Sequence, residues 1–343
     1  MRLIRPTAFP NDLINSPCEF NCCALDIPVF TLFLRLLSVA NLKANFLIAD
    51  FSEKNPDKLE DLSESNSEQI NKLTVSAVEK ASNSNEDAEL IAKVVAVASD
   101  ELANKVVEEV SKNSTEENQA LSAKVMKSIV ETNPEKIETL SDENKETMIT
   151  QTIEAAKNQA EGTSTDEIDL TNTIAEIVTK SDTGTAAKVL ETLEEVSKES
   201  DSKLSLNVVS NLTKQENYEE KMEILSVTST IVEKSITKLV EKAVENASTE
   251  EDLELVTNIV ENSKGTIADK VINSANNNEE SKKKITEVIV KVVEKNPEKA
   301  VEIIEKNKNT NTVLETVKTK IEKGEAVSTE DFEEVFDTNV SPN

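Results

Sequence analysis

The sequence predicts an all-α fold, an α-solenoid of repeats of about 80 residues that each contain about five short helices. Two observations carry this prediction. Three short motifs recur along the chain in one order and at nearly one interval, and internal repeats of this length are typical of solenoid architectures. Apolar residues follow a helical period, while the alternating runs and hairpin dipeptides typical of strands are missing.

The recurring motifs define the repeat. The first, interpreted as a helix start, is S-N-E-D from Ser84, S-T-D-E from Ser164, S-T-E-E from Ser248 and S-T-E-D from Ser328. The second is N-P-D-K from Asn55, N-P-E-K from Asn133, N-Y-E-E-K from Asn217 and N-P-E-K from Asn296. The third is A-x-K-V from Ala103, Ala186 and Ala268. Because three independent motifs keep one order, a tandem repeat is the organisation we expect.

Composition separates the chain into an atypical N-terminal segment (residues 1–45), a helical repeat array (46–326) and a C-terminal capping helix with a tail (327–343). All three cysteines, all three arginines and six of the eight phenylalanines lie within residues 1–51. The cysteines are Cys18, Cys22 and Cys23. Since no histidine accompanies them, they are interpreted as unpaired thiols rather than as a metal site.

The apolar run at residues 27–42 has three interpretations, and it is short for a membrane helix, which needs about twenty apolar residues. The first is a signal segment or membrane anchor with a small-x-small cleavage site at residues 38–40, which makes the protein an exported or membrane-anchored stalk. The second is a mis-assigned start, and the third is a genuine folded segment; both leave the protein cytoplasmic. Because the motif at Asn55 belongs to the middle of a unit, the array enters partway through a unit, as if part of a longer parent were missing.

The first complete unit illustrates the expected helices. Ser84 is expected to cap a first helix, with Asp87 three residues on, and Ser99 begins a second. Ser114 and Glu117 form a capping box that begins a third. The apolar stripes of these helices are Leu90, Ile91, Val94, Val95 and Ala98, then Leu102, Ala103, Val106, Val107 and Val110, then Ala120, Leu121, Val125, Ile129 and Val130.

Proline and glycine organise the rest of the unit. Pro134 stops the third helix, because proline disfavours helix in the residue before it, and begins a short helix through Ile137 and Leu140. A last helix runs through Met148, Ile149, Ile153 and Ala156 to Gly162. All four glycines, Gly162, Gly184, Gly265 and Gly324, are expected to stop helices with a positive φ. A long coiled coil is the alternative fold, and the frequent breaks argue against it.

The same pattern returns in the later units. Ile174, Ile177, Val178 and Val189, and then Val256, Ile259, Val260 and Val271, stand at the spacings of Ile91, Val94, Val95 and Val106. In style these repeats resemble HEAT and armadillo repeats, although the unit length differs and neither signature is present. The phrase N-P-E-K-A-V-E-I-I-E from Asn296 also resembles the acidic helical-repeat regions of large bacterial proteins with FecR-type domains. This resemblance covers residues 52–343 in pattern only. It implies no regulatory function, because the FecR-type domain is not in the chain.

The sequence predicts no catalytic, cofactor-binding or metal-ligating residue. It has no histidine, no cysteine after Cys23, and no HExxH, CxxC, P-loop or dinucleotide glycine motif. Carboxylate doublets occur at residues 108–109, 194–195 and 250–251, and a basic cluster occurs at 282–284. These are interpreted as solvated helix faces or helix starts, where acidic residues suit the helix dipole. An enzyme that uses carboxylates alone is a remote alternative.

Charge and composition favour a non-enzymatic acidic scaffold, spacer or protein-interaction module. A formal net charge of −28 repels nucleic acid and anionic membranes, so membrane contact is expected only through residues 27–42. The expected partner is a protein with a basic surface. Residues 52–343 contain one aromatic hot-spot residue, Tyr218, and neither tryptophan nor arginine.

The C-terminal region is expected to form a short helix capped by Ser328. Its apolar residues Phe332, Val335 and Phe336 would close the exposed end of the array. A docking peptide is the alternative interpretation of this segment.

Overall fold

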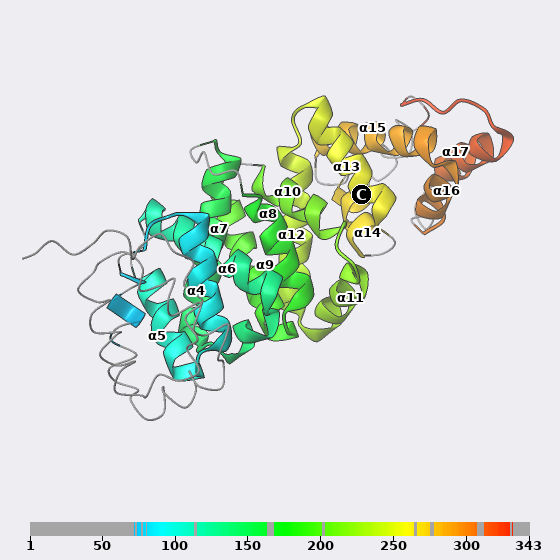
Figure 1. Cartoon of the computed structure of the whole chain (residues 1–343). Coiled ribbons are helices and arrows are strands. Elements are labelled where there is room, and N and C mark those ends of the chain that lie inside the picture. Colours follow the sequence, from blue (N-terminus) through cyan, green and yellow to red (C-terminus); the bar gives the residue numbers. More distant parts are fainter. Residues whose placement is uncertain are drawn as a thin grey trace, which may run out of the picture. The chain divides into compact units, whose positions relative to one another are not determined.

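The computed structural model describes residues 81–112, 115–162, 168–200, 203–263, 266–274, 278–306 and 312–329, together with residues 72, 74–76, 78–79 and 331. The chain divides into two compact units, Met1–Ala44 and Asn45–Asn343, and every described residue belongs to the second. The described residues contain helices and no strand, so the all-α prediction is confirmed (Figure 1). The predictions for residues 1–45, which include the three cysteines and the apolar run 27–42, lie outside the described residues.

The helices whose bounds the structure describes fall into three successive groups of five. The first is α4 (Asn85–Val97), α5 (Asp100–Ser111), α6 (Glu116–Thr132), the 3-10 helix η3 (Pro134–Thr139) and α7 (Asp142–Ala160). The second is α8 (Leu170–Lys180), α9 (Thr183–Lys198), α10 (Leu204–Leu212), α11 (Tyr218–Thr228) and α12 (Thr230–Asn246). The third is α13 (Glu250–Asn262), α14 (Thr266–Asn273), α15 (Glu279–Lys295), α16 (Pro297–Lys306) and α17 (Thr312–Lys323). Each fourth element begins at the N-P-x-K motif or its N-Y-E-E-K variant.

The helices pack in two rows that follow the chain (Figure 1). In the first row, α4, α6, α8, α10, α13 and α15 each contact the next. In the second row, α5, α7, α9, α12 and α14 do the same. The rows pack against each other through chain neighbours such as α6 with α7, α8 with α9, and α13 with α14. The main contacts of a helix are therefore made with helices close to it in the sequence.

The core includes most of the apolar residues that the periodicity predicts, while Leu90 and Ala120 of the predicted stripes are only half-buried. The twelve side chains at matching spacings are each at most 4% exposed: Ile91, Val94, Val95, Val106, Ile174, Ile177, Val178, Val189, Val256, Ile259, Val260 and Val271. The alanines of the third motif, Ala103, Ala186 and Ala268, are buried as well. Burying a valine, leucine or isoleucine contributes about 1.5–3 kcal/mol, so this layer dominates the stability of the helices that form it.

In the first two groups, the lysine of the second motif connects the fourth element to the end of the first helix, whereas in the third group Lys299 pairs with Glu302 of its own helix at 3.3 Å. In the first group, Lys136 Nζ donates a hydrogen bond of 3.0 Å to the backbone oxygen of Ala98, the C-cap of α4, and lies 2.9 Å from Asp100 Oδ1. In the second group, Lys221 Nζ donates to the backbone oxygen of Ser181, the C-cap of α8. A cation at a helix C-terminus satisfies a carbonyl and suits the helix dipole. This gives a structural reason for the lysine in the motif.

Tyr218 replaces proline in the third copy of this motif, which belongs to the second group of helices. It is 7% exposed, and its hydroxyl lies 3.0 Å from Glu219 Oε1 and 3.3 Å from the backbone oxygen of Asn262. Its ring is therefore packed inside the structure, with the hydroxyl joining α11 to the end of α13.

The helix starts confirm two of the predicted caps and correct two others. Ser84 and Ser99 are N-caps, with hydrogen bonds from Asp87 N (3.1 Å) and Leu102 N (3.4 Å). The predicted box at Ser114 and Glu117 is wrong. Helix α6 begins one residue later, with Thr115 accepting from Asn118 N.

At α13 the predicted cap is also wrong by one residue, because the side chain of the adjacent residue reaches the third backbone N–H of the helix. Thr249, not Ser248, caps α13, and Thr249 and Asp252 bond each other's backbone N–H as a capping box. Asp169 caps α8, five residues after Ser164, which lies outside the described residues.

The glycine prediction holds at two of the described positions and is wrong at a third. Gly162 and Gly324 follow α7 and α17 with φ of +72° and +68°, where a side chain would be strained. Gly184 is instead the second residue of α9 and has no positive φ, because Asp182 already caps this helix start. Gly265 lies outside the described residues.

At the C-terminal end, Asp331 Oδ2 accepts a hydrogen bond of 2.9 Å from Ser328 N, and Asp331 lies 2.5 Å from Lys320. The predicted apolar cap of Phe332, Val335 and Phe336 lies outside the described residues. Within the part of the chain that the structure describes, no helix is both long and apolar enough to cross a membrane.

Candidate functional site

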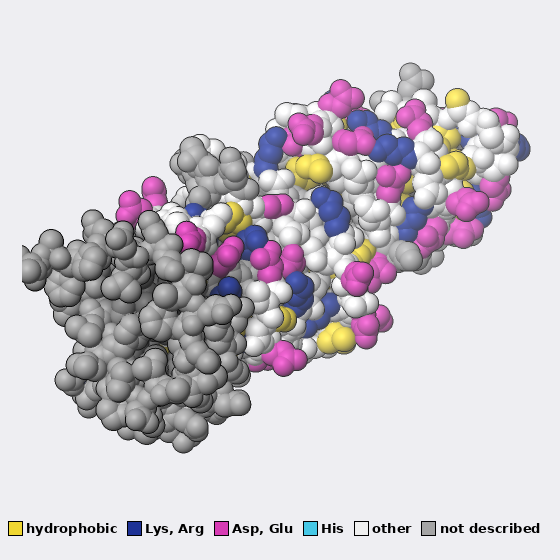
Figure 2. All heavy atoms as spheres, viewed as in Figure 1, with side chains coloured by type: hydrophobic (Ala, Val, Ile, Leu, Met, Phe, Trp, Pro, Cys, Tyr) yellow, Lys and Arg dark blue, Asp and Glu magenta, His cyan; other side chains and the backbone are white. Residues whose placement is uncertain are grey.

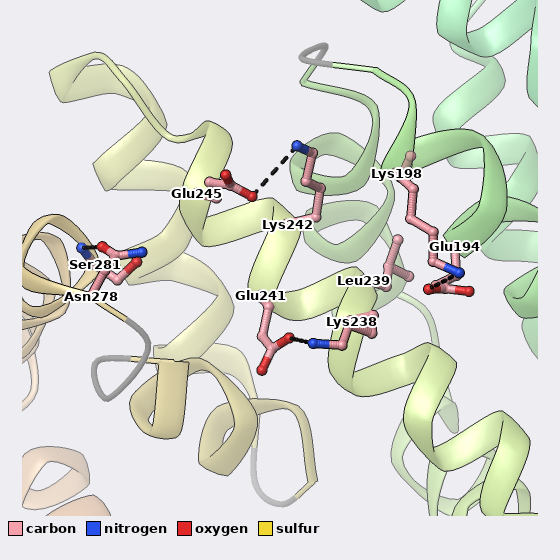
Figure 3. A pocket seen from close by; sticks show the side chains of 10 residues that line it. Glu194, Lys198, Lys238, Leu239, Glu241, Lys242, Glu245, Asn278 and Ser281 are labelled. Atoms are coloured by element: carbon pink, nitrogen blue, oxygen red, sulfur yellow. Dashed lines mark hydrogen bonds and ion pairs between the residues drawn. The ribbon is translucent and has the colours of Figure 1, made fainter.

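A polar groove of about 300 Å³ lies between α9, α12 and the start of α15 (Figure 3). Helices α9 and α12 are neighbours in one row, and α15 contributes its first turn. Asn278 caps that turn by accepting a hydrogen bond of 2.8 Å from Ser281 N. Ser197, on the α9 side, is 3% exposed. These elements make the groove a surface that three helices share.

The groove is lined by three lysines and three glutamates in short-range pairs. The distances are 2.7 Å for Lys198–Glu194, 2.7 Å for Lys238–Glu241 and 3.4 Å for Lys242–Glu245. Each of these dashed pairs in Figure 3 joins two residues of one helix. Because the charges balance, the groove favours neither an anionic nor a cationic ligand.

The protonation of Lys238 in the groove does not resemble that of a catalytic lysine. The hydrogen bond to Glu241 raises the pKa of Lys238, and attraction to Glu241 and Glu194 acts in the same direction. A lysine that acts as a nucleophile or general base needs a lowered pKa. Lys238 is therefore held as an ammonium group.

Carboxyl groups elsewhere in the described residues are also held in the charged form. Burial opposes the ionisation of Asp252, but hydrogen bonds from Lys203 Nζ, Ser248 N and Thr249 N lower its pKa to about 2. The pKa values of Asp100, Asp182, Glu254, Glu280 and Asp331 are lowered too. The leading cause is a hydrogen bond from a lysine in four of these and a hydrogen bond with Glu138 at Asp182. A general acid at neutral pH needs the opposite shift.

The carboxylate doublets singled out in the sequence lie on three different helices. Each has a lysine beside it: Glu109 lies 3.3 Å from Lys112 on α5, Glu194 lies 2.7 Å from Lys198 on α9, and Glu250 on α13 lies 3.6 Å from Lys291. Of these three doublets, only the one on α9 contributes to the groove, through Glu194.

The basic cluster 282–284 lies in the first turns of α15. Lys282 and Lys284 pair with Glu279 (3.7 Å) and Glu280 (2.9 Å), and Lys284 Nζ donates a hydrogen bond of 2.8 Å to the backbone oxygen of Glu245. Two of the three lysines therefore pair with glutamates of their own helix, and one of these two, Lys284, also contacts the end of α12.

A second surface was not predicted from the sequence. Ile224 and Val227 of α11 and Ile231 of α12 are exposed, at 42%, 81% and 63%. We call these three residues the α11 outer face. Ile224 and Val227 lie three residues apart on α11, whereas Ile231 follows the extended residue Ser229 at the start of α12, so no single helical period contains all three.

Within the described residues, no group of three or more His, Cys, Asp or Glu side chains could hold a metal ion. Comparisons with protein-family models, with curated proteins and with solved structures find no match.

Proposed function

We propose that the protein is a non-enzymatic, acidic helical-repeat scaffold, an α-solenoid of tandem five-helix units that binds a partner protein. The observation that carries this proposal is the packing order, in which each helix contacts mainly its chain neighbours in two rows. Stacked helical units expose long surfaces that single-core domains of the same size lack. The three groups of five helices support the tandem unit.

The state of the ionisable side chains supports a binding role rather than catalysis. The described carboxyl groups with a shifted pKa have a lowered one, which favours the charged form. The lysines of the groove are paired with glutamates. Such groups stabilise helix starts and junctions, and they keep the surface strongly acidic.

The partner that this surface favours is a protein with a basic region. A net charge of −28 steers cations toward the chain and opposes nucleic acid. Binding is expected to weaken as the salt concentration rises, because salt screens exposed charges over about 8 Å at physiological ionic strength.

Chemical cross-linking of the full chain in its own cell tests the proposal. We expect adducts with a protein that carries a Lys/Arg-rich segment, and purified complexes that weaken as salt rises. An unrelated acidic helical protein of similar net charge serves as the control. If the control captures the same proteins, or if no adduct forms, the chain is a spacer and the binding proposal is wrong.

A further inference from the structure

The α11 outer face is not required by the fold. The inner face of α11 is already complete, because Tyr218, Met222 and Leu225 are buried at a helical spacing. This inner face packs against α9, α12 and α14. The apolar residues on the opposite side therefore add nothing to the core, yet Val227 is 81% exposed.

The corresponding elements of the other two groups lack such a face. Helix α11 has 11 residues where η3 has 6, and the longer helix carries the additional apolar positions. In α16, Ile303 and Ile304 are buried. Among the residues that the structure describes, the exposed large hydrophobic side chains are the three of the α11 outer face.

The surroundings of this face are acidic. Within residues 216–234, the exposed charged residues are Glu216, Glu220, Glu223, Glu233 and Lys234. The lysine within α11, Lys221, directs its Nζ to the backbone oxygen of Ser181 instead. In Figure 2, apolar side chains reach the surface at the lower edge that α11 occupies in Figure 1, with acidic side chains beside them. The apolar face thus has a negatively charged rim.

We infer that the α11 outer face binds a basic amphipathic segment of the partner protein, in a contact that rests on the proposed scaffold function. Apolar side chains of the segment cover Val227 and Ile231, and its Lys or Arg side chains meet Glu220 and Glu223. Amphipathic helices recognise exposed apolar surfaces in this way. A second copy of the chain is disfavoured, because it would bring one acidic rim against another in a molecule with a net charge of −28.

The test uses the full chain and a short, fluorescent, helical peptide of leucine and lysine, with the same peptide carrying glutamate for lysine as its control. We expect saturable binding of the lysine peptide, measured by fluorescence anisotropy, and no binding of the glutamate peptide. Val227→Ser with Ile231→Ser should weaken binding about tenfold or more, since it removes two apolar contacts. As both side chains are exposed, the thermal melt should stay unchanged, which separates lost binding from lost folding.

A matched pair of charge reversals tests the rim. Glu220→Lys with Glu223→Lys should weaken binding several-fold, whereas Glu86→Lys with Glu89→Lys should leave it nearly unchanged. Both pairs are exposed, lie three residues apart near the start of a helix, and change the net charge equally. Equal losses in the two variants would mean non-specific attraction to an acidic protein, and the inference would be wrong.

A photo-cross-linking amino acid at position 227 of the full chain identifies the occupant. A peptide adduct supports the inference, while a cross-link to a second copy or to another segment of the same chain overturns it. Failure here is distinguishable from failure of the scaffold proposal. If cellular cross-linking still yields a basic partner that binds the Val227→Ser, Ile231→Ser variant normally, the scaffold stands and only the location is wrong.

Discussion

Asp252 shows how a buried charge is used at a helix start. It is 2% exposed and accepts hydrogen bonds from Lys203 Nζ (2.7 Å), Ser248 N (3.0 Å) and Thr249 N (2.9 Å). Because its folded pKa is about 2 and the ordinary value is 3.8, it contributes stability above about pH 4 that is lost as the pH falls toward 2. Asp252→Asn should lower the unfolding free energy by about 2 kcal/mol at pH 7 and by much less at pH 2.5.

Urea unfolding at the two pH values measures this difference. Glu251→Gln is the control, since Glu251 is exposed in the same first turn. A loss for Asp252→Asn that is equally large at pH 2.5 would show that the charge is not its source.

The motif lysine Lys136 should stabilise the chain more than an ordinary surface lysine does. Its side chain is 12% exposed, and its Nζ joins Ala98 O to Asp100. Lys136→Met should cost about 1–2 kcal/mol in urea unfolding, because it leaves a helix C-terminus without its donor. The substitution should also raise the pKa of Asp100 toward its ordinary value, because the hydrogen bond from Lys136 is the main reason that this pKa is low.

The control, Lys105→Met, breaks an exposed pair with Glu101 and should cost at most about 0.5 kcal/mol. Equal costs would refute the capping role.

At the scale of elements, periodicity predicted the helices and their buried faces well, and the exact helix starts less well. An apolar stripe is repeated over several turns, whereas an N-cap depends on a single side-chain oxygen. Thr115 and Thr249 are therefore the N-caps of α6 and α13, although the sequence pattern favoured the serines before them. The candidate surfaces were harder to predict. The groove is formed by residues of α9, α12 and α15. The spacing of apolar residues within one unit does not indicate which helices of different units lie side by side. The α11 outer face crosses the break at Ser229.

Substitution of two glycines by alanine should change the stability of their helices in opposite directions. Gly162→Ala should destabilise the end of α7 by about 1 kcal/mol, since alanine is strained at a φ of +72°. Gly184→Ala should stabilise α9 by up to about 1 kcal/mol, because alanine is the better helix former and its Cβ would lie 3.4 Å from Asp182 Oδ1, an ordinary contact. Thermal unfolding of both variants measures the signs. A loss at both positions would show that the added methyl group at position 184 disturbs the Asp182 cap of α9.

For the whole molecule, packing that follows the chain implies that stability is local. A helix in this arrangement is stabilised by its neighbours in the two rows, so distant helices contribute little to its stability. Ile174 of α8 is fully buried, and Ile174→Ala should cost about 2–5 kcal/mol. Its effect should reach the contact partners of α8, which are α6, α7, α9 and α10, before it reaches α13 or α15.

Hydrogen exchange with mass spectrometry on the full chain measures where that cost appears. We expect Ile174→Ala to accelerate exchange in α6–α10 and to leave α15 near its original rate. Val256→Ala in α13, at the matching position one group later, should reverse the pattern and accelerate α13–α15 while sparing α4 and α5. If either substitution accelerated exchange equally along all described helices, the chain would unfold as one cooperative core. The stacked-unit architecture, and the scaffold proposal that depends on it, would then be wrong.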